Sequence, residues 1–238
     1  MNNRKNVIFI SAIILLFFYT LLSGCAKEEL LIFPGLLEKK EIYYENGNLN
    51  SYTLVYYNKL RQKVCEQKHD KYDNIEYVIK YKYNKAGQIS ELRQSSPDNK
   101  QYFKVVSKYD ADSALLISAS KYDNKNRLAG VSNFIYDDKG ANSRTEEYRQ
   151  GKLTAVIKND FDSDGKLLKS EFYDPFGDLQ YYTVFIYNAE GRETSQTSYN
   201  QKGEAQSSVK SFYENGDIVK LEKYDNQNLI FYTMCIYH

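Results

Sequence analysis

The clearest candidate for chemistry in this sequence is a run of carboxylates that ends at Glu171. Asp160, Asp162 and Asp164 alternate with other residues, and Gly165 follows directly. Closely spaced carboxylates with a more distant, bidentate Glu are the oxygen ligands of a Ca²⁺-binding loop that connects two helices. The spacing therefore makes a calcium site one interpretation of this stretch.

A solvated hairpin turn explains the same carboxylates. Asp162 and Gly165 occupy turn positions that recur along the chain, and the flanking residues 154–158 and 169–173 have the pattern of strands, not of helices. We favour the hairpin turn and predict neither a metal nor another cofactor. Calcium binding between Asp160 and Glu171 stays open as the alternative.

Histidine and cysteine offer little for catalysis. His69 and His238 are the only histidines, and neither has a second ligand at a metal-binding spacing. A Cys–His or Ser–His pair would have to use His69, so we predict no catalytic residue and no enzymatic activity. We expect free thiols at Cys65 and Cys235, because a linear array would hold the two far apart.

Tyrosine is the most conspicuous residue type, with 24 Tyr and 12 Phe but no Trp. Aromatics at fixed repeat positions could stack on sugars, but cross-strand packing is the stronger explanation, and Trp, the best stacking platform, is absent. Tyr52, Tyr56, Tyr182 and Tyr232 fall on the opposite face of their expected strands. We regard these four as the better candidates for an exposed binding stripe.

The first residues have the pattern of a secretory signal, with two basic residues before an apolar run from Val7 to Leu22. This run is shorter than the roughly 20 residues of a membrane-spanning helix. Residues 22–25 read Leu-Ser-Gly-Cys, which resembles the lipobox of bacterial lipoproteins. The resemblance implies that residues 1–24 are a signal peptide and that Cys25 receives a thioether-linked diacylglycerol. An uncleaved apolar anchor is the alternative, and it would also tether the chain.

The residues after Cys25 suggest where the lipid lies. Ala26 is not the Asp that resembles an inner-membrane retention signal, and residues 26–29, Ala-Lys-Glu-Glu, are similar to the acidic export tags of some bacterial surface lipoproteins. We therefore predict a lipid-anchored protein of the bacterial outer membrane, in contact with the membrane through its N-terminal lipid. Whether it faces the periplasm or the cell surface stays open.

The rest of the chain consists of a repeat of about 25 to 26 residues. One aromatic series comprises Tyr57, Tyr83, Tyr109, Tyr136, Phe161, Tyr187, Tyr213 and Tyr237, and a second comprises Tyr122, Tyr148, Tyr173, Tyr199 and Tyr224. An Asp or Asn commonly follows the aromatic, and a Gly and an aliphatic residue close the turn. The aliphatic residue and the next aromatic are an even number of steps apart, as in Leu179 to Tyr187, so both lie on one face of a strand. The repeat predicts a β-hairpin.

The turn motifs, Tyr-Asp-x-x-Gly-x-Leu and Tyr-Glu-Asn-Gly-Asn-Leu, resemble the YD repeats of Rhs-type proteins and MORN-type variant repeats, over roughly Tyr44 to Tyr237. We expect an all-β fold, an antiparallel meander of tandem β-hairpin repeats that forms a twisted or coiled elongated sheet. Residues 43–238 would form this repeat domain. Residues 25–42 would form a lipidated tether and an N-terminal segment that docks on it.

The charge balance narrows the choice of partners. The formal net charge is +1, from 32 basic and 31 acidic residues, so the basic surface that a nucleic-acid backbone requires is missing. We predict a non-catalytic binding or scaffolding surface, with an unidentified protein partner favoured over a glycan. The Rhs resemblance raises an immunity or toxin-associated protein as the alternative, and a cell-surface carbohydrate-binding module is the second.

Overall fold

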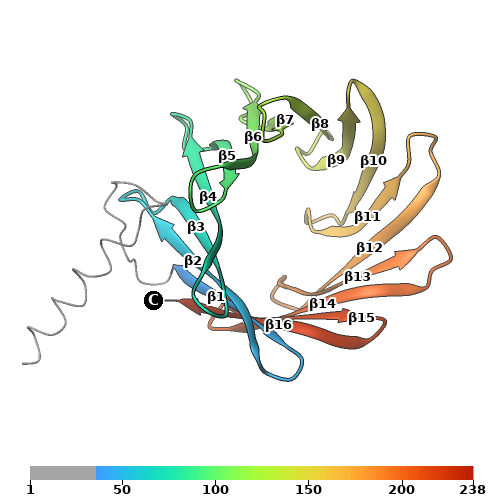
Figure 1. Ribbon diagram of the computed structural model, residues 1–238. Helices are drawn as coiled ribbons and strands as arrows, with labels where there is room; N and C mark the ends of the chain where they lie inside the picture. The colour runs from blue at the N-terminus through green and yellow to red at the C-terminus, as the bar shows by residue number, and fades with distance from the viewer. Residues whose placement is uncertain (1–35, 238) are drawn as a thin grey trace, which may run out of the picture.

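The computed structural model describes residues 36–237, and every regular element in this range is a β-strand (Figure 1). The predicted signal peptide, Cys25 and most of the predicted tether lie outside the described residues. Within the described range, no helix is long and apolar enough to cross a membrane. The first strand begins at Leu37, earlier than Tyr43, where the repeat domain was expected to begin.

Sixteen strands follow one another along the chain. They are β1 (Leu37–Tyr44), β2 (Leu49–Tyr57), β3 (Lys63–Asp70), β4 (Ile75–Tyr83), β5 (Ile89–Ser95), β6 (Gln101–Tyr109), β7 (Leu116–Tyr122), β8 (Leu128–Tyr136), β9 (Asn142–Arg149), β10 (Lys152–Phe161), β11 (Leu167–Tyr173), β12 (Leu179–Tyr187), β13 (Glu193–Asn200), β14 (Ala205–Glu214), β15 (Asp217–Asp225) and β16 (Asn228–Tyr237). The strand predicted from Leu179 to Tyr187 is β12, with the same bounds.

The sheet closes on itself. Each strand pairs antiparallel with its neighbours in the sequence, and β1 pairs with β16 in a register that runs from Leu37 opposite Tyr237 to Tyr44 opposite Phe231 (Figure 1). The antiparallel meander is confirmed, but the expected elongated sheet is wrong, because the structure is a closed barrel. An open array would leave unpaired N–H and C=O groups on two edge strands, and closure pairs them.

The hairpin turns follow the predicted chemistry. In the turn between β10 and β11, Oδ1 of Asp162 accepts hydrogen bonds from the backbone N–H of Asp164 at 2.9 Å and of Lys166 at 2.8 Å. Gly165 has a positive φ of 81°, a conformation that strains residues with a Cβ. The Asp or Asn that follows an aromatic therefore organises the turn from its side chain.

Each hairpin also contains a register shift that the repeat pattern did not predict. Phe172 on β11 lies opposite Tyr181 on β12, whereas Tyr173 lies opposite Leu179, so Gln180 is an extra residue on β12. Such β-bulges increase the local twist of a strand pair. A bulge in every hairpin helps the meander to curl into a ring.

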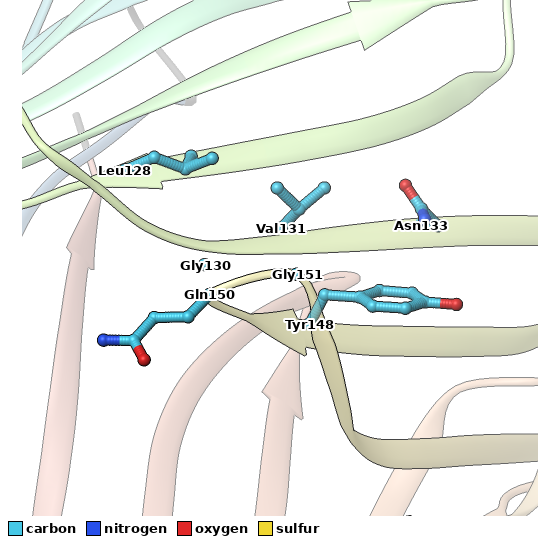
Figure 2. A pocket seen from close by; sticks show the side chains of 7 residues that line it. All are labelled: Leu128, Gly130, Val131, Asn133, Tyr148, Gln150 and Gly151. Atoms are coloured by element: carbon cyan, nitrogen blue, oxygen red, sulfur yellow. The ribbon is translucent and has the colours of Figure 1, made fainter.

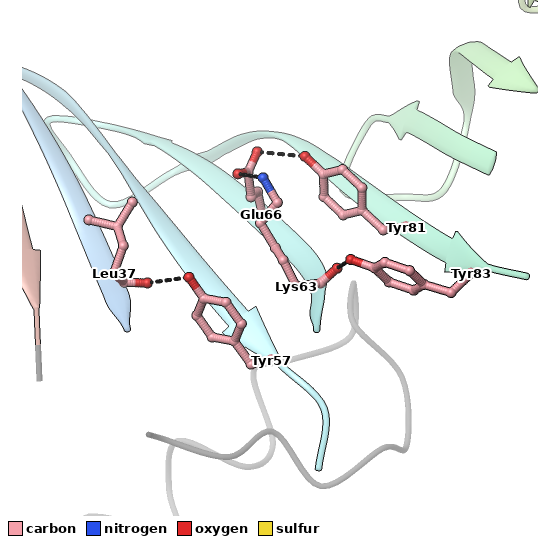
Figure 3. A network of polar contacts seen from close by, with 6 residues as sticks. All are labelled: Leu37, Tyr57, Lys63, Glu66, Tyr81 and Tyr83. Atoms are coloured by element: carbon pink, nitrogen blue, oxygen red, sulfur yellow. Dashed lines mark hydrogen bonds and ion pairs between the residues drawn. The ribbon is translucent and has the colours of Figure 1, made fainter. Parts of the chain in front are cut away.

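Each even-numbered strand is longer than the odd-numbered strand before it, and we call the two kinds long and short strands. A repeated hydrogen bond connects long strands to the short strands that precede them. The hydroxyl of the last tyrosine on a long strand donates to the carbonyl at or near the start of the preceding strand, over 2.7 to 3.0 Å. The pairs are Tyr57 with Leu37, Tyr83 with Lys63, Tyr109 with Ile89, Tyr136 with Leu116, Tyr187 with Leu167, Tyr213 with Glu193 and Tyr237 with Ile218 (the first two in Figure 3). The first aromatic series therefore forms a ring at one end of the barrel, which we call the entry rim because β1 begins there.

One position of this ring has no hydroxyl. The long strand β10 ends at Phe161, and the carbonyl of Asn142 at the start of β9 accepts a hydrogen bond from Nδ2 of Asn159 instead, over 2.8 Å. A buried or half-buried backbone carbonyl without a partner costs free energy. The side chain of Asn159 supplies the bond that Phe161 cannot make.

The two faces of the sheet differ in exposure. On β14, Lys210 and Phe212 are exposed, whereas Val209 and Ser211 between and beside them are half-buried. Side chains converge inside a ring and diverge outside it, so the face of Lys210 is the outer face and the face of Val209 is the inner face. Register places Tyr182 and Glu171 on the outer face and Tyr181 and Phe172 on the inner face.

The barrel is wide. A ring of 16 strands, spaced about 4.8 Å apart and tilted by about 40°, has a backbone diameter of roughly 30 Å. Few side chains of the described residues are buried, and the hydrophobic ones are Val55, Cys65, Val78, Ala155 and Val156. The sheet is therefore held mainly by its backbone ladder and by contacts between neighbouring side chains on each face.

The tyrosine ring predicts a measurable loss of stability. Replacing Tyr187 with Phe removes the 2.9 Å bond to the Leu167 carbonyl and should lower the free energy of unfolding by about 1 kcal/mol. Tyr181→Phe on the same strand is the matched control, because the Tyr181 hydroxyl has no hydrogen bond within residues 36–237. Urea unfolding monitored by circular dichroism measures both, and equal losses in the two variants would contradict the role of the ring.

Candidate functional site

The outer face carries a repeated set of three side chains on the short strands. A cation, a glutamate and a tyrosine occupy alternate positions of one strand, so all three point to the same side. The sets are Lys39–Glu41–Tyr43 on β1, Arg144–Glu146–Tyr148 on β9, Lys169–Glu171–Tyr173 on β11 and Lys220–Glu222–Tyr224 on β15. We call each set a triad.

In every triad the glutamate binds both neighbours. In the β11 triad, Oε1 of Glu171 lies 2.5 Å from Nζ of Lys169, and Oε2 accepts a hydrogen bond from the Tyr173 hydroxyl at 2.7 Å. The β15 and β1 triads repeat this geometry with distances of 2.6 to 2.7 Å. Both carboxylate oxygens are occupied, so the glutamate is held in one orientation.

These contacts lower the pKa of the glutamate in the β1, β11 and β15 triads. Hydrogen bonds from Lys169 and then from Tyr173 lower the pKa of Glu171, and those from Lys220 and Tyr224 do the same for Glu222. On β1, the hydrogen bond to Glu41 is the largest cause that raises the pKa of Tyr43 to about 12. The β1, β11 and β15 triads therefore keep their carboxylates ionised and their phenols neutral at physiological pH.

The triads extend onto the neighbouring long strands through the triad lysines. The ammonium groups of Lys39, Lys169 and Lys220 lie 4.5, 4.7 and 4.9 Å from the ring centroids of Tyr52, Tyr182 and Tyr232, respectively. Such cation–π contacts contribute about 0.5 to 1 kcal/mol each at exposed sites. The β1, β11 and β15 triads are thereby coupled to the next strand of the sheet.

A continuous row of these contacts crosses the closure of the barrel. The Tyr232 ring stacks on the Tyr43 ring with centroids 5.1 Å apart, which joins the β15 triad to the β1 triad. Beyond the β1 triad, the Tyr52 ring stacks on His69 at 4.7 Å. We call this row, from the β15 triad to His69, the seam cluster.

A second cluster repeats the arrangement on β10 to β13. Nζ of Lys158 lies 4.5 Å from the ring centroid of Tyr173 in the β11 triad. On the other side of the triad, Tyr182 stacks on Tyr199 with centroids 5.1 Å apart. We call this row the β11 cluster. Both clusters present tyrosines, lysines and carboxylates together on the outer face.

The predicted binding stripe belongs to these clusters only in part. Tyr52, Tyr182 and Tyr232 lie on the outer face as expected, but stacking and cation–π contacts leave them half-buried rather than fully exposed. Burial raises the pKa of Tyr52, and the hydrogen bond to Asp73 raises it further. Tyr56 donates a hydrogen bond to Oε1 of Gln67 at 3.2 Å and is likewise half-buried. The triads themselves were missed as a unit, although their alternate spacing on the short strands is a signal in the sequence.

The carboxylate run between Asp160 and Glu171 is a strand–turn–strand hairpin. The flanking strands β10 and β11 confirm the predicted strand pattern around the turn. Asp162 uses its side chain within the turn, and Lys169 and Tyr173 occupy both oxygens of Glu171. Among residues 36–237, no three His, Cys, Asp or Glu side chains gather in a way that could hold a metal ion.

His69 is a nearly buried member of the seam cluster. Its Nδ1 lies 3.2 Å from the Asp73 carbonyl oxygen, and its Nε2 has no hydrogen-bond partner within the described residues. Of the two cysteines in the barrel, Cys235 has a free thiol, as predicted. The same prediction is wrong for Cys65, which is disulfide-bonded.

Comparison with known proteins gives likenesses to solved structures only. No family model matches the chain, and no curated protein matches its sequence. A chain in the crystal structure of TcdB2-TccC3-Cdc42 is similar with 11% identity and a TM-score of 0.33, over 79% of this chain and 11% of that chain. This protein therefore spans about a tenth of the toxin-complex chain that it matches.

Two porin-like proteins are also similar. The one from Bacteroides uniformis has 9% identity and a TM-score of 0.42, over 87% of this chain and 100% of that chain. The one from Bacteroides vulgatus has 12% identity and a TM-score of 0.36, over 85% of this chain and 98% of that chain.

The triads predict a specific dependence of stability on pH. Because the pKa of each of Glu41, Glu171 and Glu222 is lowered on folding, their stabilising effect is present above the unfolded pKa of about 4.3 and is lost as pH falls through the folded value. A variant with all three glutamates replaced by Gln should therefore have a lower free energy of unfolding near pH 7. Below about pH 4.3, its free energy of unfolding should fall less steeply with pH than that of the wild type. Urea unfolding across pH measures this, and an unchanged slope would contradict it.

Glu193 provides a control of opposite sign. Burial raises its pKa, so its ionised form opposes folding above the folded pKa. Glu193→Gln should therefore keep or raise the free energy of unfolding near neutral pH. A loss equal to that of the triad variant would show that removing any glutamate weakens the barrel.

Proposed function

We propose that this protein is a lipid-anchored component of the bacterial envelope that acts as a non-catalytic binding or scaffolding surface. In this proposal a lipid on Cys25 holds the chain at the outer membrane, and the barrel presents the seam cluster to a protein partner. The proposal combines the Leu-Ser-Gly-Cys motif at residues 22–25 with the side chains that the outer face displays.

The observation that carries the binding role is a group of exposed apolar side chains beside the seam cluster, which we call the apolar border. Phe212, Ile230 and Ile236 are 41%, 40% and 38% exposed on strands β14 and β16, beside the cluster. Exposed apolar side chains that gather beside polar ones mark protein-interaction surfaces. Tyrosines and cations with such apolar side chains beside them have the composition of an interface centre.

The rigidity of the clusters supports binding without catalysis. Each triad glutamate has both oxygens bonded to its own lysine and tyrosine, as Glu222 does with Lys220 and Tyr224. A carboxylate that is ionised and fully engaged is poorly suited to take or give a proton. Side chains that are already ordered lose less entropy on association, which favours binding.

The stacking of the tyrosines favours a protein over a glycan. A sugar ring needs an open aromatic face, but Tyr232 stacks on Tyr43 on one side and receives the Lys220 ammonium on its ring. A protein partner can use the charges of both signs, the phenol edges and the apolar border together. A specific protein interface uses about 20 to 30 residues on each side, so the seam cluster would form the centre of such an interface and not the whole of it.

The lipid anchor predicts a clear change in fractionation. In Cys25→Ser the acceptor sulfur is absent, so the chain should lose its lipid and leave the membrane fraction. Metabolic labelling with a fatty acid and mass spectrometry of the N-terminal peptide test this. The same mass shows directly whether the Cys25 sulfur carries the lipid. Cys235→Ser is the matched control and should stay labelled and membrane-bound, whereas an unlabelled wild-type chain would refute the anchor.

If the partner binds the outer face, substitutions on that face should weaken partner capture, and substitutions on the inner face should not. Tyr232→Ala and Tyr182→Ala remove tyrosines of the seam cluster and of the β11 cluster from the outer face. Tyr181→Ala, one residue away on β12, removes an inner-face tyrosine that is 45% exposed. If the seam cluster is the centre of the interface, Tyr232→Ala should weaken capture of a partner from envelope extracts at least tenfold, which corresponds to about 1.4 kcal/mol.

The other two variants sharpen this comparison. Tyr181→Ala should leave capture unchanged, and Tyr182→Ala tests whether the β11 cluster takes part. Equal losses for Tyr181 and Tyr232 would point to unfolding rather than to a binding face. Absence of any reproducible partner would refute the protein-binding role, and retention on a glycan array that depends on Tyr232 would favour the carbohydrate-binding alternative.

A further inference from the structure

The inner face is hollowed at one place because two consecutive long strands lack a large side chain there. Each long strand has one inner-face residue near its start that belongs to a common ring, and this residue is either aromatic or small. The ring consists of Ser51, Tyr77, Phe103, Gly130, Ala155, Tyr181, Ser207 and Phe231. Only Gly130 on β8 and Ala155 on β10 are neighbours in this ring that are both small. Between them lies β9, with Glu147 paired to Ser132 and Ala155.

A cleft of about 700 Å³ occupies this region. It is lined by strands β7 to β10, by the turn between β7 and β8 and by the turn between β9 and β10. A Cβ at Gly130 would lie 3.0 Å from the backbone oxygen of Tyr148, closer than almost all real contacts. The absence of a side chain at Gly130 is therefore required by the approach of β9. A second hollow of about 250 Å³ involves the same glycine and is lined by Val131, Asn133 and Tyr148 (Figure 2).

The cleft has an excess of positive charge. Three cations, Lys121, Arg127 and Arg149, line it together with two carboxylates, Asp123 and Glu147. Arg127 is neutralised by Asp123, with its guanidinium 2.7 Å from Oδ2. Within residues 36–237, neither Lys121 nor Arg149 forms an ion pair, and both side chains are exposed. Two cations are therefore available to a ligand, against the one remaining carboxylate.

The other polar groups of the cleft suit hydroxyl groups. Oε2 of Glu147 accepts a hydrogen bond from the Ser132 hydroxyl at 2.9 Å, which fixes the carboxylate and leaves it able to accept further bonds. Gln150 and Thr154 also line the cleft. A pocket of 300 to about 1,000 Å³ holds a small molecule, and a mostly polar lining selects a ligand that is rich in hydrogen-bonding groups.

We propose that this cleft binds a small anionic sugar. The negative group of the sugar binds Lys121 and Arg149, and a ring hydroxyl donates to Glu147. A carboxylate and a phosphate are both compatible with the two cations, so a uronic acid and a sugar phosphate share the chemistry that the cleft recognises. The proposal concerns the inner face and does not depend on the protein partner proposed for the outer face.

The test is calorimetric titration of the full-length protein in detergent with D-glucuronate, glucose 6-phosphate, glucose and inorganic phosphate. We expect saturable binding of glucuronate, of glucose 6-phosphate, or of both, which identifies the anion, and much weaker binding of glucose and of inorganic phosphate. Lys121→Gln and Arg149→Gln should each weaken binding about tenfold, the loss expected for one charge-assisted hydrogen bond.

Lys223→Gln is the matched control. Lys223 immediately precedes the last tyrosine of β15, as Lys121 precedes that of β7, and both lysines contact an aromatic ring, at 5.4 Å and 4.6 Å respectively. Lys223 does not line the cleft, so its replacement should leave binding unchanged. Failure of both anionic sugars to bind, equal binding of glucose, binding of inorganic phosphate as tight as that of glucose 6-phosphate, or an equal loss in Lys223→Gln would overturn the proposal. Unchanged thermal unfolding of the three variants would show that the comparison concerns binding.

Discussion

The pairing of β1 with β16 is the constraint on which the rest of the structure depends. A meander of hairpins has two faces and two edges, and only closure removes the edges and gives the faces different roles. Once the ring is closed, inner side chains crowd one another and outer ones spread apart, so each face gathers its own set of side chains: the stacked tyrosines of the triad clusters outside and the cations of the cleft inside. The closure also brings β15, β16, β1 and β2 together, and the seam cluster exists only because residues from both ends of the chain meet there.

The stabilising interactions are small and numerous, which suits a wide ring with little interior to fill. A surface ion pair such as that of Lys220 and Glu222 contributes about 1 kcal/mol or less, and a tyrosine hydroxyl bonded to a carbonyl contributes about 1 kcal/mol. Each contact recurs around the ring, so no single residue has to carry the fold. The substitution of Phe161 for a tyrosine shows this tolerance, because Asn159 satisfies the carbonyl of Asn142 from the next inner position.

The sequence was sufficient for local structure and insufficient for closure. Period-two spacing, such as Leu179 to Tyr187, predicted the strands, and Asp162 and Gly165 predicted the turn, because these signals depend on neighbouring residues only. Closure depends on the tilt and shear summed over all strands, and the bulges that set them, such as Gln180, have no distinctive residue type. The charged residues of the triads could be read from the sequence, but the triads could not be recognised as units. Their role depends on stacking partners far away in the chain, such as Tyr232 for Tyr43. The cleft depends on Gly130 and Ala155 being neighbours across β9, which register alone reveals.

In the proposal that Cys25 carries a lipid, the two ends of the barrel differ in their connection to the membrane. Strand β1 begins at the entry rim, and the chain from Cys25 to Leu37 can extend at most about 40 Å. The tyrosine ring at the entry rim therefore lies at the end of the barrel to which the lipid is connected. The turns that border the cleft, 123–127 and 150–151, join odd-numbered strands to the next even-numbered ones and so lie at the opposite rim. A ligand from the aqueous side would meet the cleft first, while the seam cluster on the outer wall stays open to a partner that approaches from the side. The two proposed binding surfaces can thus be occupied together, because different faces of the same sheet supply them.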